Sequence, residues 1–182
     1  MGKVLADGLD DELVAWVEAQ PMFFVATAPT DGGHVNVSPK GYDTLRVLGP
    51  TRVAYRDLTG SGIETVAHVR DNGRVTVMWC GFDQPPRIVR VAGRGRVVLP
   101  GDAGYDVLDR TLPTMVGSRA IVVVDGDRVS TACGYSVPLM DHRGERETLE
   151  RFAQIKGEDG LEAYRRQKNA VSIDGLPGLP GT

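Results

Sequence analysis

The feature that most constrains the fold is a succession of short β-prone runs separated by tight turns. An apolar run at residues 22–28 ends in the turn-rich segment 29–33, after which residues 34–38 alternate apolar and polar side chains. Further runs lie at residues 45–48, 52–55, 74–82, 87–99, 120–124 and 128–132, the last two around a turn signal at 125–127. Adjacent runs joined by tight turns pair as antiparallel hairpins. The pattern predicts a mainly β protein, a closed or partly open β-barrel, in preference to a parallel α/β sheet.

Helical segments interrupt these runs only occasionally. Asp10 or Asp11 can cap a first helix, since a carboxylate accepts hydrogen bonds from the free N–H groups at a helix start. Further helices are predicted at residues 63–72, 101–112, 145–155 and 161–168. No repeat or linker divides the chain. We therefore expect a single domain over residues 1–182, with a helical C-terminal extension at about 141–168 and a Gly/Pro-rich tail at 169–182.

Composition limits the classes of partner. The formal net charge is −3, so no global basic field would gather nucleic acid or an anionic membrane, and an anionic ligand must be held by local donors. The N-terminal segment lacks the apolar core of a signal peptide, and no apolar run approaches the roughly 20 residues that span a bilayer. Cys80 and Cys133 are expected to be reduced thiols. These observations predict a cytoplasmic protein with neither nucleic-acid nor membrane partners.

A glycine-flanked turn at residues 59–65 is the strongest local signal for a ligand. It carries hydroxyls and stands where a strand gives way to a helix. Free N–H groups at a helix start suit a phosphate, and Ser61 and Thr65 can add hydroxyl donors beside Gly62. The alternative is a capping box, with Ser61 as the N-cap and Glu64 three residues later. The two interpretations are compatible.

Lys40 ends the strand that begins near His34, beside Pro39, which cannot donate to a strand ladder. This placement favours the rim of a barrel, where the ammonium could meet a phosphate or a flavin oxygen, although a solvated surface lysine would look the same. Arg87 and Arg90 alternate onto opposite faces of their strand and cannot both line one wall.

Other familiar site patterns are missing from the sequence. His34, His68 and His142 show no metal-ligand spacing, so no metal site is predicted. There is no Ser/His/Asp order, no Walker loop and no glycine fingerprint entering a βαβ unit. Catalytic residues therefore stay unknown at this level.

The ordered segments FFVATAP, GHVNVSPKG, TGSGIETVAH, NGRVTVMW and PPRIVRVAGRGRV resemble the pyridoxamine 5′-phosphate oxidase superfamily of FMN-binding split barrels. The later CGYSVPLMDHRGER and KNAVSIDGLPGL resemble its branch of oxidase-like proteins, so the resemblance spans roughly residues 10–179. It implies a six-stranded split barrel, a homodimer, and FMN bound in clefts between the two subunits.

The resemblance also implies site residues. On the strand that lines the flavin it places Val35, Asn36, Val37, Ser38, Pro39 and Lys40, with Lys40 at the position of a flavin-contacting lysine. Tyr55 falls on the next flavin-lining strand, and Ser61, Gly62 and Thr65 fall where the family binds the ribityl phosphate. Ile88 stands where the authentic oxidase has a glutamine that contacts the flavin.

Two departures from the authentic oxidase argue against vitamin B6 oxidation. No Arg/Ser-bearing segment follows Leu99 to clamp a substrate phosphate, and the chain ends without the closing tryptophan and arginine. We therefore expect an FMN-dependent oxidoreductase acting on an unidentified small molecule. The alternatives are a flavin carrier or sensor without turnover, and a deazaflavin-dependent reductase on the same barrel. The tail at 169–179 is expected to pack near the cofactor because it holds apolar residues.

Overall fold

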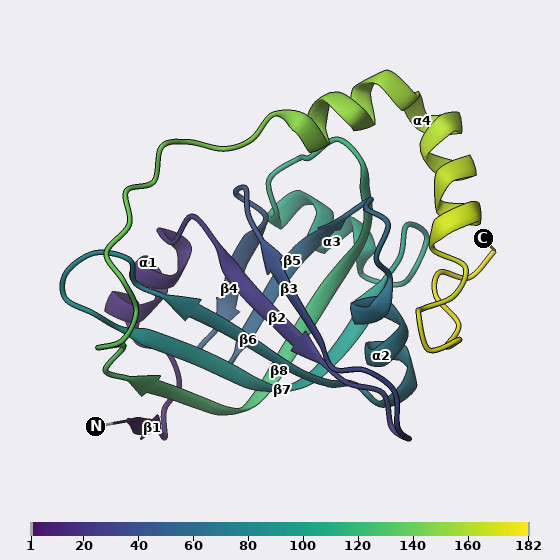
Figure 1. Ribbon diagram of the computed structural model, residues 1–182. Helices are drawn as coiled ribbons and strands as arrows, with labels where there is room; N and C mark the ends of the chain where they lie inside the picture. The colour runs from purple at the N-terminus through teal and green to yellow at the C-terminus, as the bar shows by residue number, and fades with distance from the viewer. Residues whose placement is uncertain (1, 182) are drawn as a thin grey trace.

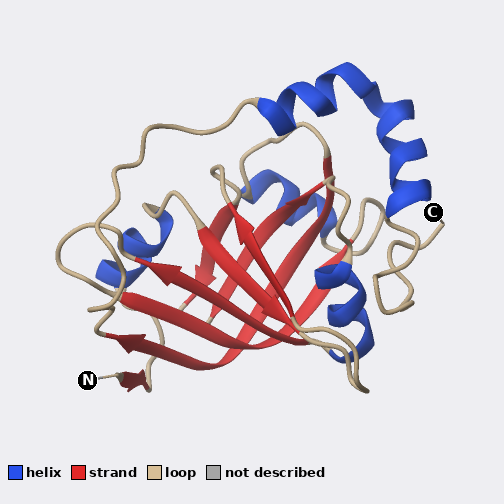
Figure 2. Ribbon diagram, in the orientation of Figure 1, coloured by secondary structure: helices blue, strands red, loops and turns tan. Residues whose placement is uncertain are grey.

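The computed structural model describes residues 2–181, and its centre is one antiparallel β-sheet with flanking helices (Figures 1 and 2). The elements in chain order are β1 (Lys3–Leu5), α1 (Asp11–Glu18), β2 (Phe23–Thr27), β3 (Asn36–Lys40), β4 (Leu45–Gly49), β5 (Arg52–Leu58), α2 (Glu64–Asn72), β6 (Arg74–Cys80), β7 (Ile88–Val98), α3 (Tyr105–Thr111), β8 (Ser118–Ala132) and α4 (Thr148–Lys168). The mainly β prediction is confirmed.

The sheet has eight strands in the described residues, where six were expected. Its strand order is β3-β2-β6-β7-β8-β5-β4, and the short β1 pairs with β8 off this path. The expected count was wrong partly because β1 was not foreseen; it pairs through Lys3 and Leu5 with Thr131 and Val129. β3 and β4 are the two ends of the path, so the sheet is open between them.

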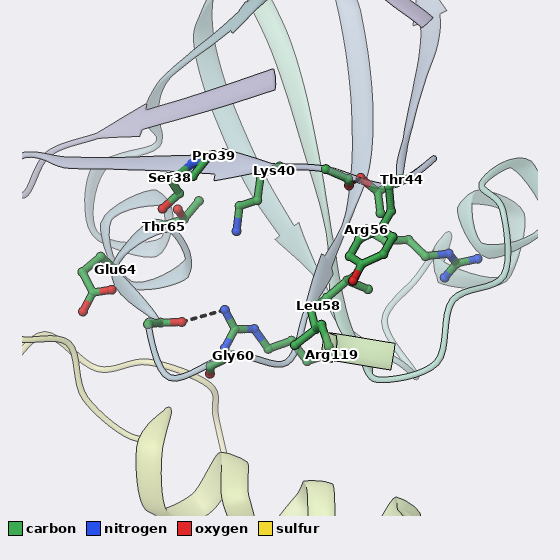
Figure 3. A pocket seen from close by; sticks show the side chains of 14 residues that line it. Ser38, Pro39, Lys40, Thr44, Arg56, Leu58, Gly60, Glu64, Thr65 and Arg119 are labelled. Carbon is green, nitrogen blue, oxygen red and sulfur yellow. Dashed lines mark hydrogen bonds between the residues drawn. The ribbon is translucent and has the colours of Figure 1, made fainter. Parts of the chain in front are cut away.

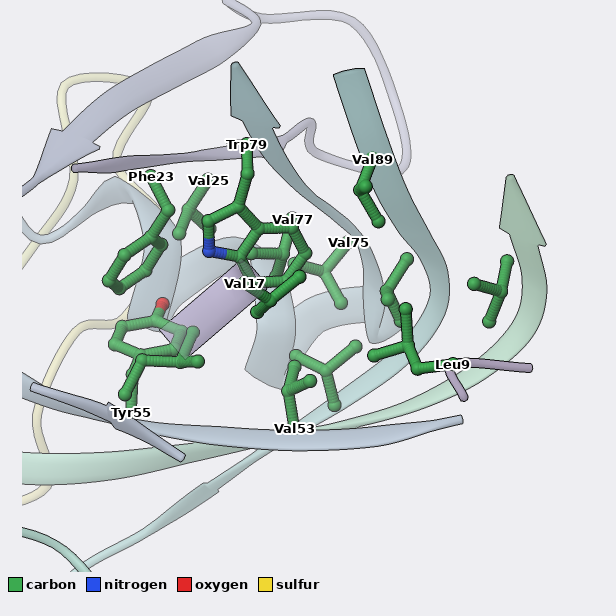
Figure 4. Packing of buried hydrophobic residues seen from close by; sticks show 14 of the residues in the cluster. Leu9, Val17, Phe23, Val25, Val53, Tyr55, Val75, Val77, Trp79 and Val89 are labelled. Atoms are coloured by element: carbon green, nitrogen blue, oxygen red, sulfur yellow. The ribbon is translucent and has the colours of Figure 1, made fainter. Parts of the chain in front are cut away.

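The core fills the inner face of this curled sheet (Figure 4). Period-two alternation sends Val25, Val77 and Val89 of three different strands into one fully buried cluster. Phe23 packs edge-on against Tyr55, with 5.3 Å between ring centroids. Valine suits these positions, because a β-branched side chain packs well on a pleated surface.

β8 is one continuous strand, so the predicted hairpin around residues 125–127 is wrong. Ala92 pairs with Arg128 and Gly93 with Gly126, which leaves Asp127 as the extra residue of a β-bulge. A Cβ atom on Gly93 would lie 2.1 Å from the carbonyl oxygen of Asp125. The glycines therefore mark a close approach of two strands, and the Asp-Gly-Asp segment does not turn the chain.

The start of α1 agrees with the sequence prediction, whereas the predicted cap of α2 and the predicted start of α4 do not. Asp10 caps α1 by accepting from the N–H of Leu13, as predicted. The capping box at the next helix is wrong: α2 begins at Glu64, its N-cap is Ile63, and no side chain caps it. α4 begins only at residue 148, so the predicted extension is not helical over 141–147, and Gly157 breaks it into two helical parts.

The Gly/Pro-rich tail packs against the rest of the protein, as predicted. Leu179 joins Ile63 and Val66 of the α2 region in a small apolar cluster. The carboxylate of Asp174 accepts from the backbone N–H of His34, 2.8 Å away, in the loop between β2 and β3. Within the described residues, no helix is both long and apolar enough to cross a membrane.

Candidate functional site

A pocket of about 360 Å³ lies where the sheet is open, between β3, β5 and the start of α2 (Figure 3). β3 contributes Ser38, Pro39 and Lys40 to its wall. The other lining residues come from segments far apart in the sequence: Gly41, Tyr42, Thr44, Arg56, Leu58, Gly60, Gly62, Glu64, Thr65, Arg119 and Leu149. The pocket therefore depends on the tertiary arrangement of five elements and two loops.

Two charged side chains of the pocket lining, Lys40 and Arg119, meet the buried carboxylate of Asp57 behind it. The Lys40 ammonium lies 2.8 Å from Oδ1 of Asp57, and Nε of Arg119 lies 2.8 Å from Oδ2 of the same carboxylate. Asp57 is fully buried. Burial alone would raise its pKa, but the positive charges and hydrogen bonds of Lys40 and Arg119 overcome burial and lower it to about 2. The group links β3 to β5 across the open side of the sheet and keeps Asp57 ionised.

A chain of hydrogen bonds joins the pocket wall to the interior. Ser38 donates to Oδ1 of Asn36, and Nδ2 of Asn36 donates to the hydroxyl oxygens of Thr65 and Thr27, at 3.0 and 3.1 Å. The Thr27 hydroxyl lies 3.0 Å from Nδ1 of the fully buried His68. This network fastens the first turn of α2 to β3, so the two walls that meet at the pocket are held in a fixed relation.

The start of α2 presents unpaired donors beside the pocket. Within residues 2–181, no hydrogen bond joins the backbone N–H of Ser61 or of Ile63. Such groups, together with the positive end of the helix dipole, suit an anion. Among the described residues that line the pocket, Glu64 carries the one carboxylate, and its Oε1 accepts from the N–H of Ile173 in the tail.

The structure brings together part of the predicted set. Ser38, Pro39, Lys40, Gly62 and Thr65 line the pocket. Asn36 stands behind the wall and holds Thr65, while Ser61 lies exposed on the neighbouring loop.

Val35 and Val37 lie outside the pocket lining, on exposed parts of the β3 segment, at 72% and 61% exposure. Ile88 is also outside the lining, at the start of β7.

Tyr55, which was expected among the flavin-binding residues, does not line the pocket. Its side chain lies in the barrel core, and its hydroxyl is buried with no hydrogen-bond partner among the described residues. Burial, reinforced by the negative charge of Asp57, raises its pKa well above the usual range. Alternation along β5 explains the difference, since Arg56 and Leu58 line the pocket while Tyr55 faces inward.

Sequence reasoning missed Asp57, Arg119 and His68 as residues of this region. Asp57 and Arg119 belong to none of the sequence motifs, and His68 shows no metal-ligand spacing. The available signal was a charged side chain next to a β-prone run: Asp57 follows the run 52–55, and Arg119 directly precedes the run 120–124. Ions at such positions are paired when they are buried.

Comparison with known proteins supports the family that the ordered sequence motifs resemble. Residues 9–133 match the family model described as pyridoxamine 5′-phosphate oxidase. The chain is 43% identical to the pyridoxamine 5′-phosphate oxidase family protein ustO of Aspergillus flavus, over 97% of this chain and 78% of that protein.

Two crystal structures share the fold. A Lactobacillus delbrueckii protein assigned provisionally to the pyridoxamine 5′-phosphate oxidases is 24% identical, with a TM-score of 0.56 over 70% of this chain and 98% of that chain. HupZ from group A Streptococcus is 19% identical, with a TM-score of 0.53 over 66% of this chain and 91% of that chain. At these identities the likeness concerns the fold alone. The family match and the 43% identical relative decide the assignment: this chain belongs to the pyridoxamine 5′-phosphate oxidase family.

Proposed function

We propose that this protein binds FMN in the pocket between β3 and α2 and acts as a flavin-dependent oxidoreductase on a small molecule. The observation that carries the proposal is the donor set of the pocket. The Lys40 ammonium and the Thr65 hydroxyl belong to residues that line one space, and the unpaired N–H groups of Ser61 and Ile63 lie on the loop beside it. FMN presents a phosphate dianion and a flavin edge rich in acceptors, so the donors fit the group chemically.

The protein's own residues would bind and orient the cofactor. The loop at residues 60–63, the start of α2 and Thr65 would hold the phosphate, and Lys40 would meet either the phosphate or the pyrimidine edge. Lys40 has further N–H donors beyond the one that Asp57 accepts. The flavin itself would supply the hydride or electron transfer, which accounts for a pocket without a legible acid–base pair.

The cofactor test uses the protein as purified from cells. We expect a yellow protein whose ligand, released by heat, has the mass of FMN. A deazaflavin mass would support the deazaflavin-dependent reductase, and a protein that retains no flavin and binds no added FMN would contradict the proposal. Bound FMN that nicotinamide cofactors and chemical reductants leave unreduced would favour a carrier or sensor over an oxidoreductase.

We further propose a homodimer that covers the pocket. Val35 and Val37 are exposed at the edge strand β3, and exposed Ile173 adjoins Asp174, which contacts His34 beside them. Exposed apolar side chains gathered at a sheet edge mark an interaction surface. A second copy seated here would bring Val35 and Val37 to the flavin region, although neither lines the pocket of one chain.

Replacing Val37 with Asp should therefore separate the subunits and weaken FMN binding about tenfold or more, because a charge cannot be buried in that interface without a partner. Light scattering gives the oligomeric state, and titration gives the dissociation constant. Val107→Asp on α3 is the control, since Val107 is equally exposed and lies on a different element. A Val37→Asp protein that stays dimeric, or a monomeric wild type with FMN bound, would contradict this interface.

A further inference from the structure

A second cavity, of about 230 Å³, lies between the end of α1, the start of β2 and the loop that follows β3. Its inner wall is apolar and comes from four different elements: Val17, Phe23, Leu45 and Trp79. All four side chains are buried. A small cavity with an apolar interior suits one ring of a small molecule better than a polar chain.

The indole N–H of Trp79 is a hydrogen-bond donor without a partner. Within residues 2–181, no oxygen accepts from it. Trp79 is 1% exposed, and Figure 4 shows its nitrogen on the side of the ring that faces Phe23, with 6.2 Å between the two ring centroids. The indole nitrogen keeps some contact with solvent, unlike the Tyr55 hydroxyl, which is unpartnered and sealed in the core.

This donor therefore opens into the cavity that Trp79 lines. Buried tryptophan N–H groups normally find an acceptor, because an unmade hydrogen bond in the interior costs free energy. No acceptor within the described residues fills that role here. An oxygen atom on a bound molecule would fill it.

The outer part of the cavity is acidic. Glu18, Asp43 and Glu145 belong to its lining and are exposed, in contrast to the apolar inner wall. Arg46 binds both oxygens of Asp43 and so offsets one of the three charges. Glu145 lies 3.4 Å from the His142 imidazole, and among the described lining residues there is no lysine or arginine. This rim would attract a cation.

Tyr42 joins this cavity to the proposed FMN pocket, because it lines both. Its φ is 59°, in the left-handed region that residues other than glycine rarely occupy. Glu145 accepts from its N–H at 3.4 Å, and the carbonyl oxygen of Arg146 accepts from its hydroxyl. The tyrosine is thereby held between the two cavities, so a molecule in the second lies next to the FMN site.

We propose that this cavity is the substrate subsite and that it binds a small aromatic amine. The apolar wall would hold the ring, the Trp79 N–H would donate to an oxygen on the ring, and the ammonium would lie at the carboxylate rim. This inference rests on the proposed FMN function, because the flavin in the adjoining pocket is what would make such a molecule a substrate. The acidic rim disfavours an anionic substrate such as a phosphate ester.

The test measures the binding of three ring compounds to FMN-loaded protein by calorimetric titration. Tyramine carries both a ring oxygen and an ammonium, phenethylamine lacks the oxygen, and 3-(4-hydroxyphenyl)propionate carries a carboxylate in place of the ammonium. We expect tyramine to bind about tenfold more tightly than phenethylamine, the difference that one hydrogen bond makes. The propionate should bind at least about 100-fold more weakly than tyramine, since its charge is repelled by the rim.

Two variants separate the donor from the rim. Trp79→Phe keeps an aromatic ring and removes the N–H, so tyramine should weaken about tenfold and phenethylamine less than about twofold. Glu18→Gln keeps the oxygen that accepts from the N–H of Val47 and removes the charge, so both amines should weaken by about threefold or more. Asp11→Asn is the control, because Asp11 is an exposed carboxylate on α1 outside the lining.

FMN-loaded protein that binds neither amine would overturn this inference and leave the proposed function standing. The inference would also fail if Trp79→Phe weakened both amines equally, if Asp11→Asn weakened them as much as Glu18→Gln, or if the propionate bound as tightly as tyramine. Should Trp79→Phe not fold, the three ligands and Glu18→Gln still decide the matter. A protein that binds tyramine and no FMN would overturn the proposed function, and the substrate role with it.

Discussion

Replacing Asp57 with Asn should lower the free energy of unfolding by about 3–5 kcal/mol, because it leaves Lys40 and Arg119 beside a buried neutral group. Asp57 is fully buried and lies 2.8 Å from both cations, and Asn would fill its space without its negative charge. The link between β3 and β5 would weaken at the same time. Urea denaturation at pH 7 measures the change. Asp125→Asn is the control, since its ion pair with Arg52 is half-exposed and should contribute within about 1 kcal/mol.

The same carboxylate predicts a pH dependence of stability. Its pKa is about 2 in the folded protein against an ordinary 3.8, because the two cations outweigh the effect of burial. A lowered folded-state pKa contributes stability that is present above the ordinary value and is lost as the pH falls through the folded value. Wild type should therefore lose about 2 kcal/mol between pH 5 and pH 2 through this group.

Denaturation curves across that pH range should show the Asp57 contribution in wild type, and Asp57→Asn should lack it. If Asp57→Asn is as stable as wild type at neutral pH, the charged group does not hold the sheet together. If both proteins lose equal stability on acidification, other carboxylates account for the pH dependence.

Replacing Lys40 with Met should weaken FMN binding about 10- to 100-fold, because one charge-assisted hydrogen bond contributes about 1.5–3 kcal/mol. Methionine keeps much of the length of the side chain and removes the charge. The Lys40 side chain is 20% exposed and lines the pocket, so its ammonium can reach a ligand while Asp57 accepts one of its hydrogen bonds. Titration of FMN and riboflavin into both proteins locates the contact.

A loss confined to FMN would place Lys40 at the phosphate, and equal losses for FMN and riboflavin would place it at the isoalloxazine ring. Unchanged affinity for both would remove Lys40 from the site. Lys3→Met, a change on β1 outside the pocket lining, controls for the general effect of losing a positive charge.

Much of the fold follows from local pattern. The alternation at residues 34–38 and the β-prone run at 52–55 predicted strands, Asp10 caps α1 as expected, and α2 ends at Asn72 as predicted. The hairpin predicted at residues 125–127 was wrong because a β-bulge and a hairpin turn both favour glycine and aspartate. Only the paired strands on either side, β5 and β7, distinguish the two.

The pocket also combines residues that local motifs indicate with residues whose orientation depends on tertiary packing. Ser38, Lys40, Gly62 and Thr65 belong to motifs that lie within 30 residues of one another, and the structure places all four in the lining of one pocket. Tyr55 stands on a strand that lines the pocket, but its side chain faces the core, because which face of β5 points inward depends on the neighbours that cover it.

The sequence by itself determined the antiparallel strands, the glycine-flanked turn before α2 and the family, since these depend on residues close together in the chain. The meeting of Asp57, Arg119 and Asn169 was decided only by the tertiary structure. These three residues come from β5, β8 and the segment after α4, and what brings them together is the strand order and the path of the tail over the loop. Periodicity reports which face of an element is buried, and it carries no information about which distant element covers that face.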